Sequence, residues 1–344
     1  MMDAVIDEVM ALARRPEPGK ETCLLLSTTA RQGVQAPLRL SGFLRGRQLR
    51  VVHVVVHAWE PAAELVRQAD GAVAFIALDG EMKEPFGGQS LLDLHVQIRR
   101  STVLYLKVND LTADGVVASL LPQWGPGLAS KRIIVVGAGN VGAKIAQRLV
   151  ELGCRVHCHR RDPAAARTVC EAINLLKPAP CTGEALPAAS VEAGSPWDLV
   201  LVCTPGTFGF TPAMRARVAP EGIVMDVGVG TLDLNVVQAG GEPAIRFVRF
   251  DSRAAIMGHL ELSIAARAQQ SQMGRRTLGK TTVVSGGYIG APGDVIVDDW
   301  QRPSVLLGRC DGKGGVVPLT AEERTRYEQI LMGHQMATRT EERS

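Results

Sequence analysis

A glycine-rich turn between a buried strand and an amphipathic helix constrains this chain more than any other feature. Residues 133–136, Ile-Ile-Val-Val, form a predicted strand that runs directly into Gly137-Ala-Gly139-Asn-Val-Gly142. Apolar residues then recur at the spacing of one helix face, at Ile145, Leu149 and Leu152. A second strand is predicted after this helix. This strand–turn–helix–strand context gives the pattern G-x-G-x-x-G a physical meaning.

Each residue of this turn has a distinct expected role. Gly137 permits the tight turn, Gly139 lets the backbone approach a pyrophosphate, and Gly142 lets the helix sit close to the sheet. The helix then begins near Asn140 and Val141, where unpaired N–H groups and the positive end of the helix dipole favour phosphate. We therefore predict that these five residues bind a dinucleotide. The alternative is an ordinary tight turn in an α/β sheet.

The end of the second strand indicates which dinucleotide binds. Sites that prefer NAD usually carry an acidic residue there, which accepts hydrogen bonds from the ribose hydroxyls. This chain instead has His159, Arg160 and Arg161, and the first acid is Asp162. Two guanidinium groups suit the 2′-phosphate of NADP, because arginine presents a planar fork of donors. We predict NADP rather than NAD; the alternative is a solvated basic loop in which Asp162 and Pro163 only begin the next helix.

Length, composition and charge exclude several function classes. A chain of 344 residues with 46% hydrophobic and 21% charged residues suits two globular domains. A net charge of +3 does not favour nucleic acid or membrane surfaces, and an aromatic content of 4% is too low for a base-stacking surface. No apolar run is long enough to span a membrane, and the first 15 residues read as an amphipathic helix rather than a signal peptide.

The cysteines indicate a reducing compartment. Their number, seven, is odd, and no C-x-x-C pair occurs. Reduced thiols in a cytoplasmic protein are the expected state. Cys154, His157, Cys158 and His159 invite a zinc hypothesis. Successive residues of a strand face opposite sides and no second ligand pair lies nearby, so no metal is expected.

The first 125 residues are predicted to form a separate α/β domain. Its expected strands are residues 22–27, 38–44, 49–56, 73–78 and 102–108, with the second and third paired across the turn at 45–48. Its expected helices are residues 59–68, 90–100 and 113–121. The breaker cluster Gln-Trp-Gly-Pro-Gly at 123–127 is interpreted as the hinge that ends this domain.

Residues 126–275 are predicted to form a Rossmann domain. Further strands are expected at 199–203, 223–227 and 245–250, and helices near 163–176, 211–218, 232–239 and 254–273. This alternation implies a doubly wound parallel sheet covered on both faces. Residues 276–344 are interpreted as a C-terminal extension that packs on the first domain or on a partner subunit. The predicted fold class is therefore α/β, with an N-terminal α/β domain, a Rossmann domain and an extension.

Several motifs resemble two-domain dehydrogenases of the shikimate dehydrogenase type. Thr112-Ala-Asp114-Gly115 is similar to their N-T-D-G motif, and Arg160-Arg161 stands where they carry an Asn-Arg-Thr motif for the NADP phosphate. Val202-Cys203-Thr204-Pro205 is similar to their A-T-P turn beside the nicotinamide ribose, and Met225-Asp-Val-Gly228 lies in the equivalent following strand. The resemblance implies that Thr204, Pro205 and Gly228 contact cofactor and that Asp114 contacts substrate. The S-L-S-P motif and a clear catalytic-lysine segment of that family are absent.

A second resemblance is to adenosylhomocysteine hydrolases. Lys107-Val-Asn109-Asp110 is similar to their V-N-D segment, which precedes a Rossmann domain that keeps NAD bound. The T-K-x-x-F-D-N residues of that family are missing. Neither resemblance therefore identifies a substrate.

The segment 106–115 holds the candidate catalytic residues. It supplies Lys107, Asn109 and Asp114 at the end of a predicted strand that faces the linker. Lys107 and Asn109 would share one face of an extended strand, and burial beside a carboxylate would lower the pKa of the lysine for proton transfer. The alternative is a solvated strand end, in which Asp110 or Thr112 caps the helix predicted from residue 113.

Other residues carry weaker hypotheses. Lys83, beside Glu84, is a second candidate for the proton-transferring lysine, with an exposed loop as its alternative. Arg253 could bind a substrate carboxylate or form a surface ion pair at a helix start. The run Gly-Lys-Gly-Gly at 312–315 is interpreted as a tight turn. His53 and His57 are expected to pack under the core without a role.

Together these features predict an NADP-dependent oxidoreductase that acts on a small polar metabolite. Candidate substrates are a hydroxy acid, an amino or imino acid, or a cyclic polyol acid, with Lys107 and Asp114 moving the proton. One alternative is an enzyme that retains NAD and catalyses no net redox change, as hydrolases and cyclising deaminases do. Another is a non-catalytic nucleotide-binding protein. A homodimer in the cytoplasm is the expected state, with no nucleic-acid or membrane partner.

Overall fold

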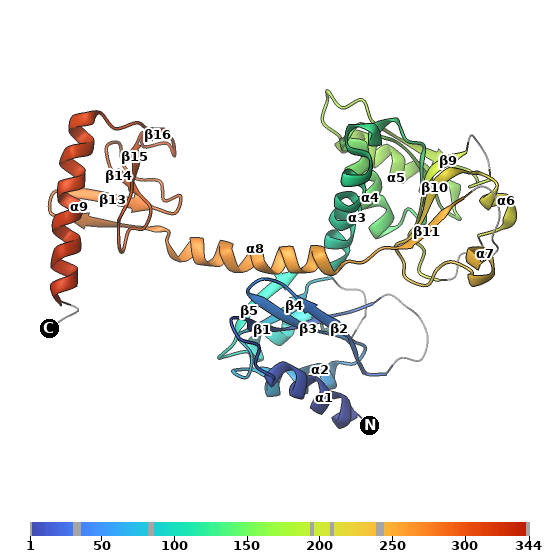
Figure 1. Cartoon of the computed structure of the whole chain (residues 1–344), viewed down its shortest axis with the longest axis horizontal. Coiled ribbons are helices and arrows are strands. Elements are labelled where there is room, and N and C mark those ends of the chain that lie inside the picture. Colours follow the sequence, from blue (N-terminus) through green and yellow to red (C-terminus); the bar gives the residue numbers. More distant parts are fainter. Residues whose placement is uncertain are drawn as a thin grey trace. The chain divides into compact units, whose positions relative to one another are not determined.

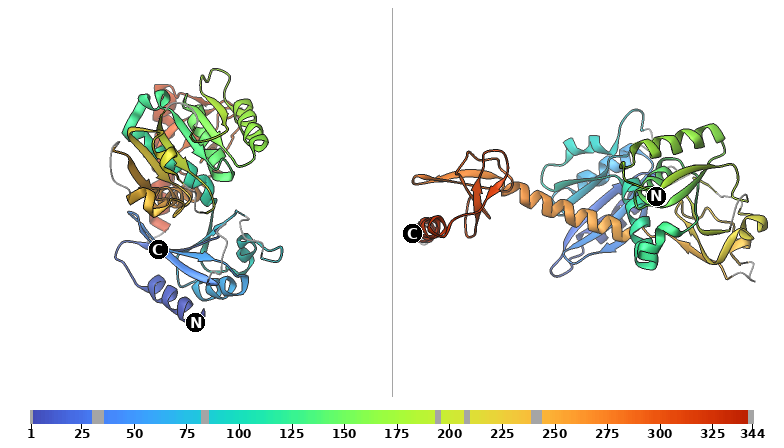
Figure 2. Two further views of the ribbon diagram at one scale, coloured as in Figure 1. Left: turned by 90° about the vertical axis from the view of Figure 1, so that its right-hand side faces the viewer. Right: turned by 90° about the horizontal axis from the view of Figure 1, so that it is seen from above.

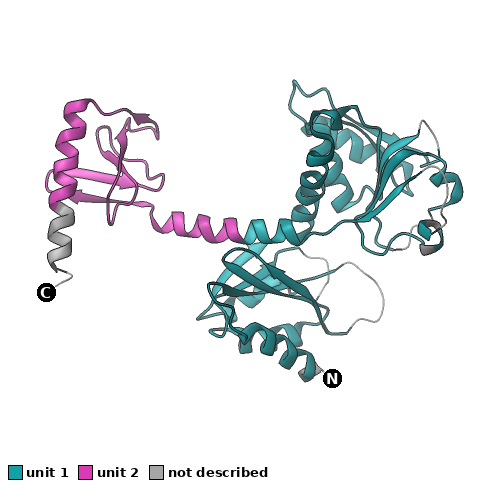
Figure 3. Cartoon of the chain, in the orientation of Figure 1, with its two compact units in different colours: residues 1–260 teal, residues 261–344 magenta. Residues whose placement is uncertain are grey.

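The computed structural model describes residues 2–29, 36–81, 86–192, 196–206, 210–238 and 244–341. The chain divides into two compact units, residues 1–260 and 261–344 (Figure 3). The first unit contains both the N-terminal α/β domain and the Rossmann domain, which are neighbouring lobes drawn in blue and in green to yellow (Figures 1 and 2). Every site discussed below lies in this first unit.

The N-terminal domain is built on a five-stranded sheet with the order β2-β3-β1-β4-β5. Its strands are β1 (Glu21–Ser27), β2 (Leu38–Arg45), β3 (Leu49–Val56), β4 (Phe75–Asp79) and β5 (Thr102–Leu106). All neighbouring pairs are parallel except β2 and β3, which form the hairpin that the sequence predicts. Helices α1 (Met2–Arg14) and α2 (Trp59–Ala69) share one apolar core with this sheet. Alternate strand residues such as Val52 and Val54 face that core, so their neighbours face away from it.

Two local predictions for this domain are wrong. Residues 91–97 form a 3-10 helix, η1 (Leu91–Gln97), rather than an α-helix over 90–100. Helix α3 (Val108–Trp124) begins five residues before the predicted start at 113, so Lys107 is its N-cap residue and not part of a strand. The cause lies in the neighbouring strand end. Asp79 Oδ1 accepts a hydrogen bond from the backbone N of Val108 (3.3 Å), and Glu81 Oε2 accepts one from Asn109 N (3.1 Å).

The Rossmann domain contains six parallel strands in the order β11-β10-β9-β6-β7-β8. They are β6 (Ile133–Val136), β7 (Arg155–His159), β8 (Glu184–Ala188), β9 (Trp197–Val202), β10 (Val218–Asp226) and β11 (Arg246–Arg249). Numbered within the domain, this is the order 3-2-1-4-5-6 of dinucleotide-binding folds, so the chain reverses direction across the sheet between β6 and β9. Ligands of such sheets bind outside the carboxyl ends of the strands at this switch point.

Helices connect these strands and cover both faces of the sheet. The 3-10 helix η2 (Gly125–Ser130) leads into the domain, followed by α4 (Asn140–Glu151), α5 (Pro163–Leu176), α6 (Pro212–Arg215) and α7 (Leu234–Gln238). Ile133 and Val135 contribute to one core cluster, and Ile134 and Val136 to the other. This alternation along β6 confirms the predicted sheet with apolar residues on both faces.

The second unit is a small α/β assembly that sequence reasoning did not foresee. Helix α8 (Arg253–Ser271) spans the boundary at residue 260, and the unit then forms a five-stranded mixed sheet and a final helix. These elements are β12 (Gly274–Leu278), β13 (Thr281–Ser285), β14 (Val295–Val297), β15 (Leu306–Cys310), β16 (Val316–Val317) and α9 (Ala321–Glu341). Of the strands, only β14 was predicted. The others are short and carry few apolar residues, so their sequence pattern is weak.

Candidate active site

The glycine turn has the geometry that its sequence predicts. Gly137 adopts φ +85°, and its backbone N donates to the carbonyl oxygen of His159 (3.0 Å), which ties the turn to the end of β7. A Cβ on Gly142 would lie 2.4 Å from the Gly137 carbonyl oxygen, so only glycine lets α4 pack this closely. A Cβ on Gly139 would meet no atom of the described residues within 4 Å. Gly139 therefore borders open space, as a residue that approaches a ligand must.

This open space belongs to a cavity of about 1270 Å³ between the Rossmann domain and the N-terminal domain. We refer to it as the cleft. Nine of the ten predicted cofactor residues line it: Gly137, Gly139, Asn140, Val141, Arg160, Arg161, Thr204, Pro205 and Gly228. The tenth, Gly142, packs beneath the turn. The segments after β6, β7, β9 and β10 thus meet at one cavity at the switch point of the sheet.

The two arginines after β7 face the cleft without an acidic partner among the described residues. Arg160 is half-buried and Arg161 is exposed. The nearest acid in the sequence, Asp162, is engaged elsewhere, because its Oδ1 accepts a hydrogen bond from Ala164 N (2.9 Å) and caps α5. The helix-capping alternative is thus correct for Asp162, while both arginines line the cleft.

The loop after β10 is held in a strained conformation beside the cleft. Val229, a β-branched residue, adopts φ +63°, which costs about 1–3 kcal/mol. The buried carboxylate of Asp226 holds this loop, since it accepts hydrogen bonds from Gly230 N and from Thr231 Oγ1 (2.8 Å). A Cβ on Gly228 would lie 2.4 Å from the Thr204 carbonyl oxygen, so the loops after β9 and β10 touch at this glycine.

The opposite wall of the cleft comes from the N-terminal domain and, apart from Asn109 of α3, was not predicted. Its polar members on or beside the strands β1, β2 and β3 are Ser27, Thr28, Thr29, Arg39, Ser41 and His53. The expectation that His53 packs under the core is wrong. His53 lies on the face of β3 that points away from the apolar core, and its Nε2 lies 2.7 Å from Ser27 Oγ. These two residues are brought together by the pairing of β1 with β3, so no local sequence motif indicates them.

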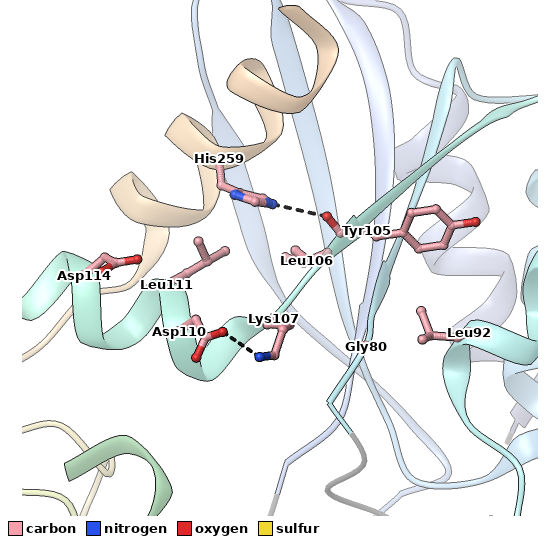
Figure 4. A pocket seen from close by; sticks show the side chains of 9 residues that line it. All are labelled: Gly80, Leu92, Tyr105, Leu106, Lys107, Asp110, Leu111, Asp114 and His259. Atoms are coloured by element: carbon pink, nitrogen blue, oxygen red, sulfur yellow. Dashed lines mark hydrogen bonds and ion pairs between the residues drawn. The ribbon is translucent and has the colours of Figure 1, made fainter. Parts of the chain in front are cut away.

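The predicted catalytic residues occupy two different places. Asn109 lines the cleft, and its Nδ2 donates to Oδ1 of Asn140 (3.4 Å). Lys107 and Asp114 instead line a second hollow of about 750 Å³, together with apolar residues such as Leu92 and Leu111 (Figure 4). The premise that Lys107 and Asn109 share a strand face is wrong, because α3 begins between them.

Lys107 is also unlike the buried lysine that was predicted. Its side chain is 58% exposed and forms an ion pair with Asp110 (2.8 Å), which is drawn in Figure 4. The hydrogen bond and the charge of Asp110 raise the pKa of Lys107 above its ordinary value. A lysine whose pKa is raised releases its proton less readily at neutral pH.

The acids of this region hold α3 against α4. Lys144 of α4 forms ion pairs with Asp110 and with Glu81 (3.4 Å), and Arg148 pairs with Asp114. Burial raises the pKa of Asp110, but hydrogen bonds and charge from Lys107 and Lys144 outweigh it, so the net shift is downward. Asp114 therefore has a structural partner in Arg148, and its proposed contact with substrate stays a prediction.

The remaining candidate residues lie in different places. Lys83 and Glu84 lie outside the described residues. Arg253 forms an exposed ion pair with Asp251 at the start of α8, and neither residue lines the cleft. His259 Nε2 lies 3.1 Å from the backbone oxygen of Tyr105 and borders the second hollow (Figure 4).

The glycine-rich run at 312–315 is a turn, as its sequence suggests. Asp311 Oδ1 accepts hydrogen bonds from Lys313 N (2.6 Å) and Gly315 N (2.9 Å). Within the described ranges, no group of three histidine, cysteine or acidic side chains is arranged to hold a metal ion. The only cysteine among the described lining residues of the cleft is Cys203, and burial raises the pKa of its thiol to about 12. Thiolate chemistry at neutral pH is therefore disfavoured there.

None of the described helices combines the length and apolar character needed to cross a bilayer. No family model matches the chain, and no curated protein matches it. Solved structures match at low identity. Ligand-free 5-ketofructose reductase of Gluconobacter sp. strain CHM43 is 16% identical with a TM-score of 0.43, over 72% of this chain and 94% of that one.

Two further solved structures are similarly distant. L-tryptophan dehydrogenase from Nostoc punctiforme is 14% identical with a TM-score of 0.37, over 62% of this chain and 61% of that one. The A chain of dipicolinate synthase from Bacillus subtilis is 12% identical with a TM-score of 0.34, over 74% of this chain and 98% of that one. At such scores these similarities carry no argument about activity, and the Rossmann fold rests on the strand order described above.

Proposed function

We propose that this chain is an NADP-dependent oxidoreductase that acts on a small polar metabolite in the cleft. The observation that carries the proposal is the convergence on one cavity of the glycine turn and two arginines, neither of which has an acidic partner among the described residues. The cleft fits a dinucleotide, because Gly139 leaves room for a diphosphate and the lining offers backbone donors and guanidinium groups. When bound, the nicotinamide would supply the hydride acceptor or donor.

Different residues around the cleft would bind different parts of the cofactor. Backbone N–H groups near Asn140 would hold the diphosphate, and Arg160 with Arg161 would hold the 2′-phosphate. Thr204 and Gly228, whose loops touch, would flank the nicotinamide ribose. Asn109 would link the N-terminal domain to the glycine turn through Asn140.

The charge of the cleft indicates a class of substrate. The absence of acidic residues among the described lining residues favours an anion, such as a hydroxy acid, an amino or imino acid or a cyclic polyol acid. A relationship to the shikimate dehydrogenase type is the more specific form of this hypothesis. The homodimer and the cytoplasmic location stay predictions, and light scattering of the purified protein tests the first.

Cofactor choice is tested by titrating wild type and Arg160→Ala with NADPH and NADH. We expect NADPH affinity to fall at least tenfold in the variant while NADH affinity is unchanged, because only NADPH carries the 2′-phosphate. Arg155→Ala is the matched control: this exposed arginine of β7, the strand that Arg160 follows, pairs with Glu184 and does not line the cleft. Equal losses for both nucleotides would refute the assignment of Arg160 to the 2′-phosphate.

Turnover is tested with a metabolite panel followed by nicotinamide absorbance in both directions. We expect reversible NADPH binding and net oxidation or reduction of at least one acid. Cofactor that survives gel filtration, with no net redox change, would favour the alternative of a retained nucleotide. Nucleotide binding without any turnover would favour a non-catalytic protein.

A further inference from the structure

Three neighbouring strands of the N-terminal domain present a cation, an imidazole and a hydroxyl to the cleft. Arg39 comes from β2, His53 from β3 and Ser27 from β1. These strands are adjacent in the sheet order β2-β3-β1. Side chains on one face of adjacent strands lie within reach of a common small ligand.

The backbone of β2 is adapted to this arrangement. A β-bulge interrupts the pairing of β2 with β3 between Leu40 and Gly42, directly opposite His53. Before the bulge Leu40 packs on the apolar core, and after it Phe43 does, so the alternation of faces shifts by one residue. The shift leaves Arg39 and Ser41 exposed on the cleft face. Bulges next to active sites re-aim side chains in this way.

The charges of the cleft favour an anionic ligand opposite the nucleotide. Its described lining residues include four arginines and no aspartate or glutamate. Arg160 and Arg161 follow β7, where the second phosphate group of NADP is proposed, and Arg249 ends β11. Arg39 is the only one of the four on the N-terminal wall. Its guanidinium group can bind a carboxylate through two parallel hydrogen bonds.

The His53–Ser27 pair has the composition of a proton relay. Nε2 of His53 lies 2.7 Å from Ser27 Oγ, and Ser27 is buried at the end of β1. With Nε2 as the acceptor, the Ser27 hydroxyl donates to the ring and its oxygen stays able to accept a proton from a substrate. Imidazole is the side chain whose ordinary pKa suits proton exchange near neutral pH.

We propose that Arg39 binds the carboxylate of a 2-hydroxy or 2-oxo acid, and that Ser27 and His53 move the proton of its reacting oxygen. This inference rests on the function proposed above. In the oxidative direction the substrate C–H bond breaks and its electron pair leaves with the hydride to oxidised NADP. The substrate O–H proton passes to Ser27 Oγ as the Ser27 proton passes to Nε2 of His53, and the C=O bond forms. The imidazolium then releases its proton to water.

The geometry favours this pair over Lys107. His53 and Ser27 line the cleft, whereas Lys107 lines the second hollow. The ion pair with Asp110 raises the pKa of Lys107, which makes it a poor proton acceptor. Lys107→Ala should therefore lower turnover only a fewfold.

The first test measures carboxylate binding in the absence of turnover. Protein loaded with NADP is titrated with oxalate, pyruvate and 2-oxoglutarate, and the melting temperature is followed. We expect at least one acid to raise the melting temperature of wild type. Arg39→Ala should lower the affinity for that acid at least tenfold. Arg45→Ala is the control, since this exposed arginine of the same strand pairs with Glu17 and does not line the cleft.

The outcomes of this titration separate the two proposals. If NADP itself leaves the melting temperature unchanged, the proposed function fails. If NADP binds but none of the acids does, or if Arg39→Ala binds them as wild type does, the assignment of Arg39 is overturned.

The second test concerns the proton relay. The ring ¹⁵N resonances of His53, identified by their loss in His53→Gln, should shift when the bound acid is added to NADP-loaded protein.

With NADPH and a 2-oxo acid that wild type reduces, His53→Gln and Ser27→Ala should lower kcat roughly 10²–10⁴-fold with little change in nucleotide affinity. Ser27→Thr should restore activity, and Ser130→Ala, in η2 and outside the cleft, should retain it. Unmoved resonances, absence of 2-oxo acid reduction, or full kcat in His53→Gln would overturn the relay.

Discussion

The two walls of the cleft are built in different ways. The Rossmann wall uses contiguous segments at strand ends, including the turn around Gly139 and Asn140, whose backbone N–H groups are proposed to hold the diphosphate. The N-terminal wall uses single side chains from separate strands, Arg39, His53 and Ser27. A backbone cradle is encoded in a short stretch of sequence, whereas a wall of side chains depends on strand pairing and register. Substitutions on the two walls should therefore have different effects on folding and binding.

The largest expected effect is the loss of the scaffold that carries the Rossmann wall. In Gly142→Val the new side chain would begin 2.4 Å from the Gly137 carbonyl oxygen, which cannot move without breaking the turn. We expect a loss of about 3 kcal/mol in the free energy of unfolding, at the upper end for overpacking. Urea denaturation measures it. A variant as stable as wild type would show that α4 does not need this close approach.

A smaller and more selective effect is expected at Gly139. Gly139→Ala places a methyl group in open space, so folding should be unaffected while the cradle for the diphosphate is filled. NADPH and NADH should both bind about tenfold more weakly, as titration calorimetry would show. Gly127→Ala is the matched control, because an added Cβ there would also meet no atom of the described residues within 4 Å, while Gly127 lies in η2 and does not line the cleft. Unchanged affinity for both nucleotides would remove the diphosphate from this turn.

The ion pairs that hold α3 against α4 should be sensitive to acid. The net pKa of Asp110 is lowered in the folded protein, so its ion pairs stabilise fully above the ordinary pKa of 3.8 and are lost as the pH falls through the lowered value. Asp110→Asn should therefore cost about 1 kcal/mol near neutral pH and nothing in strong acid. Urea unfolding at a series of pH values measures the difference. A difference that persists in strong acid would assign it to packing rather than charge.

The smallest effect is expected from an arginine near the cleft that belongs to neither wall. Arg253→Ala removes an exposed ion pair with Asp251 and should change neither nucleotide binding nor carboxylate binding. Comparison with Arg39→Ala sharpens the contrast, since both residues are exposed arginines of the first unit. If Arg253→Ala lowers the affinity for the carboxylate and Arg39→Ala does not, the anion site lies at the start of α8.

Local patterns in the sequence predicted the elements around the glycine turn well. The strand over 133–136, the glycine turn and the helix that follows were all located, because their signals lie within about twenty consecutive residues. The hairpin of β2 and β3 and the helix at 163–176 were likewise confirmed. In the second unit only β14 was found, because short strands with few apolar residues give little periodicity.

Predictions for the candidate catalytic residues failed where distant residues decide the local conformation. From sequence alone, Lys107 reads as the continuation of a strand. In the structure Asp79 and Glu81, which follow β4, bind the first backbone N–H groups of α3, so the helix begins at Val108 and turns Lys107 away from the cleft. The partner of Asp114, Arg148, likewise comes from another helix.

The sequence by itself determined the glycine turn, the basic strand end and the alternation of strands and helices in the Rossmann domain, since these depend on neighbours in the chain. Only the tertiary structure decided which side chains face the glycine turn across the cleft. Ser27 and His53 are 26 positions apart, and they meet because β1 pairs with β3 in one particular register. A shift of one residue would turn His53 to the other face of the sheet, and that register is set by the packing of the whole domain.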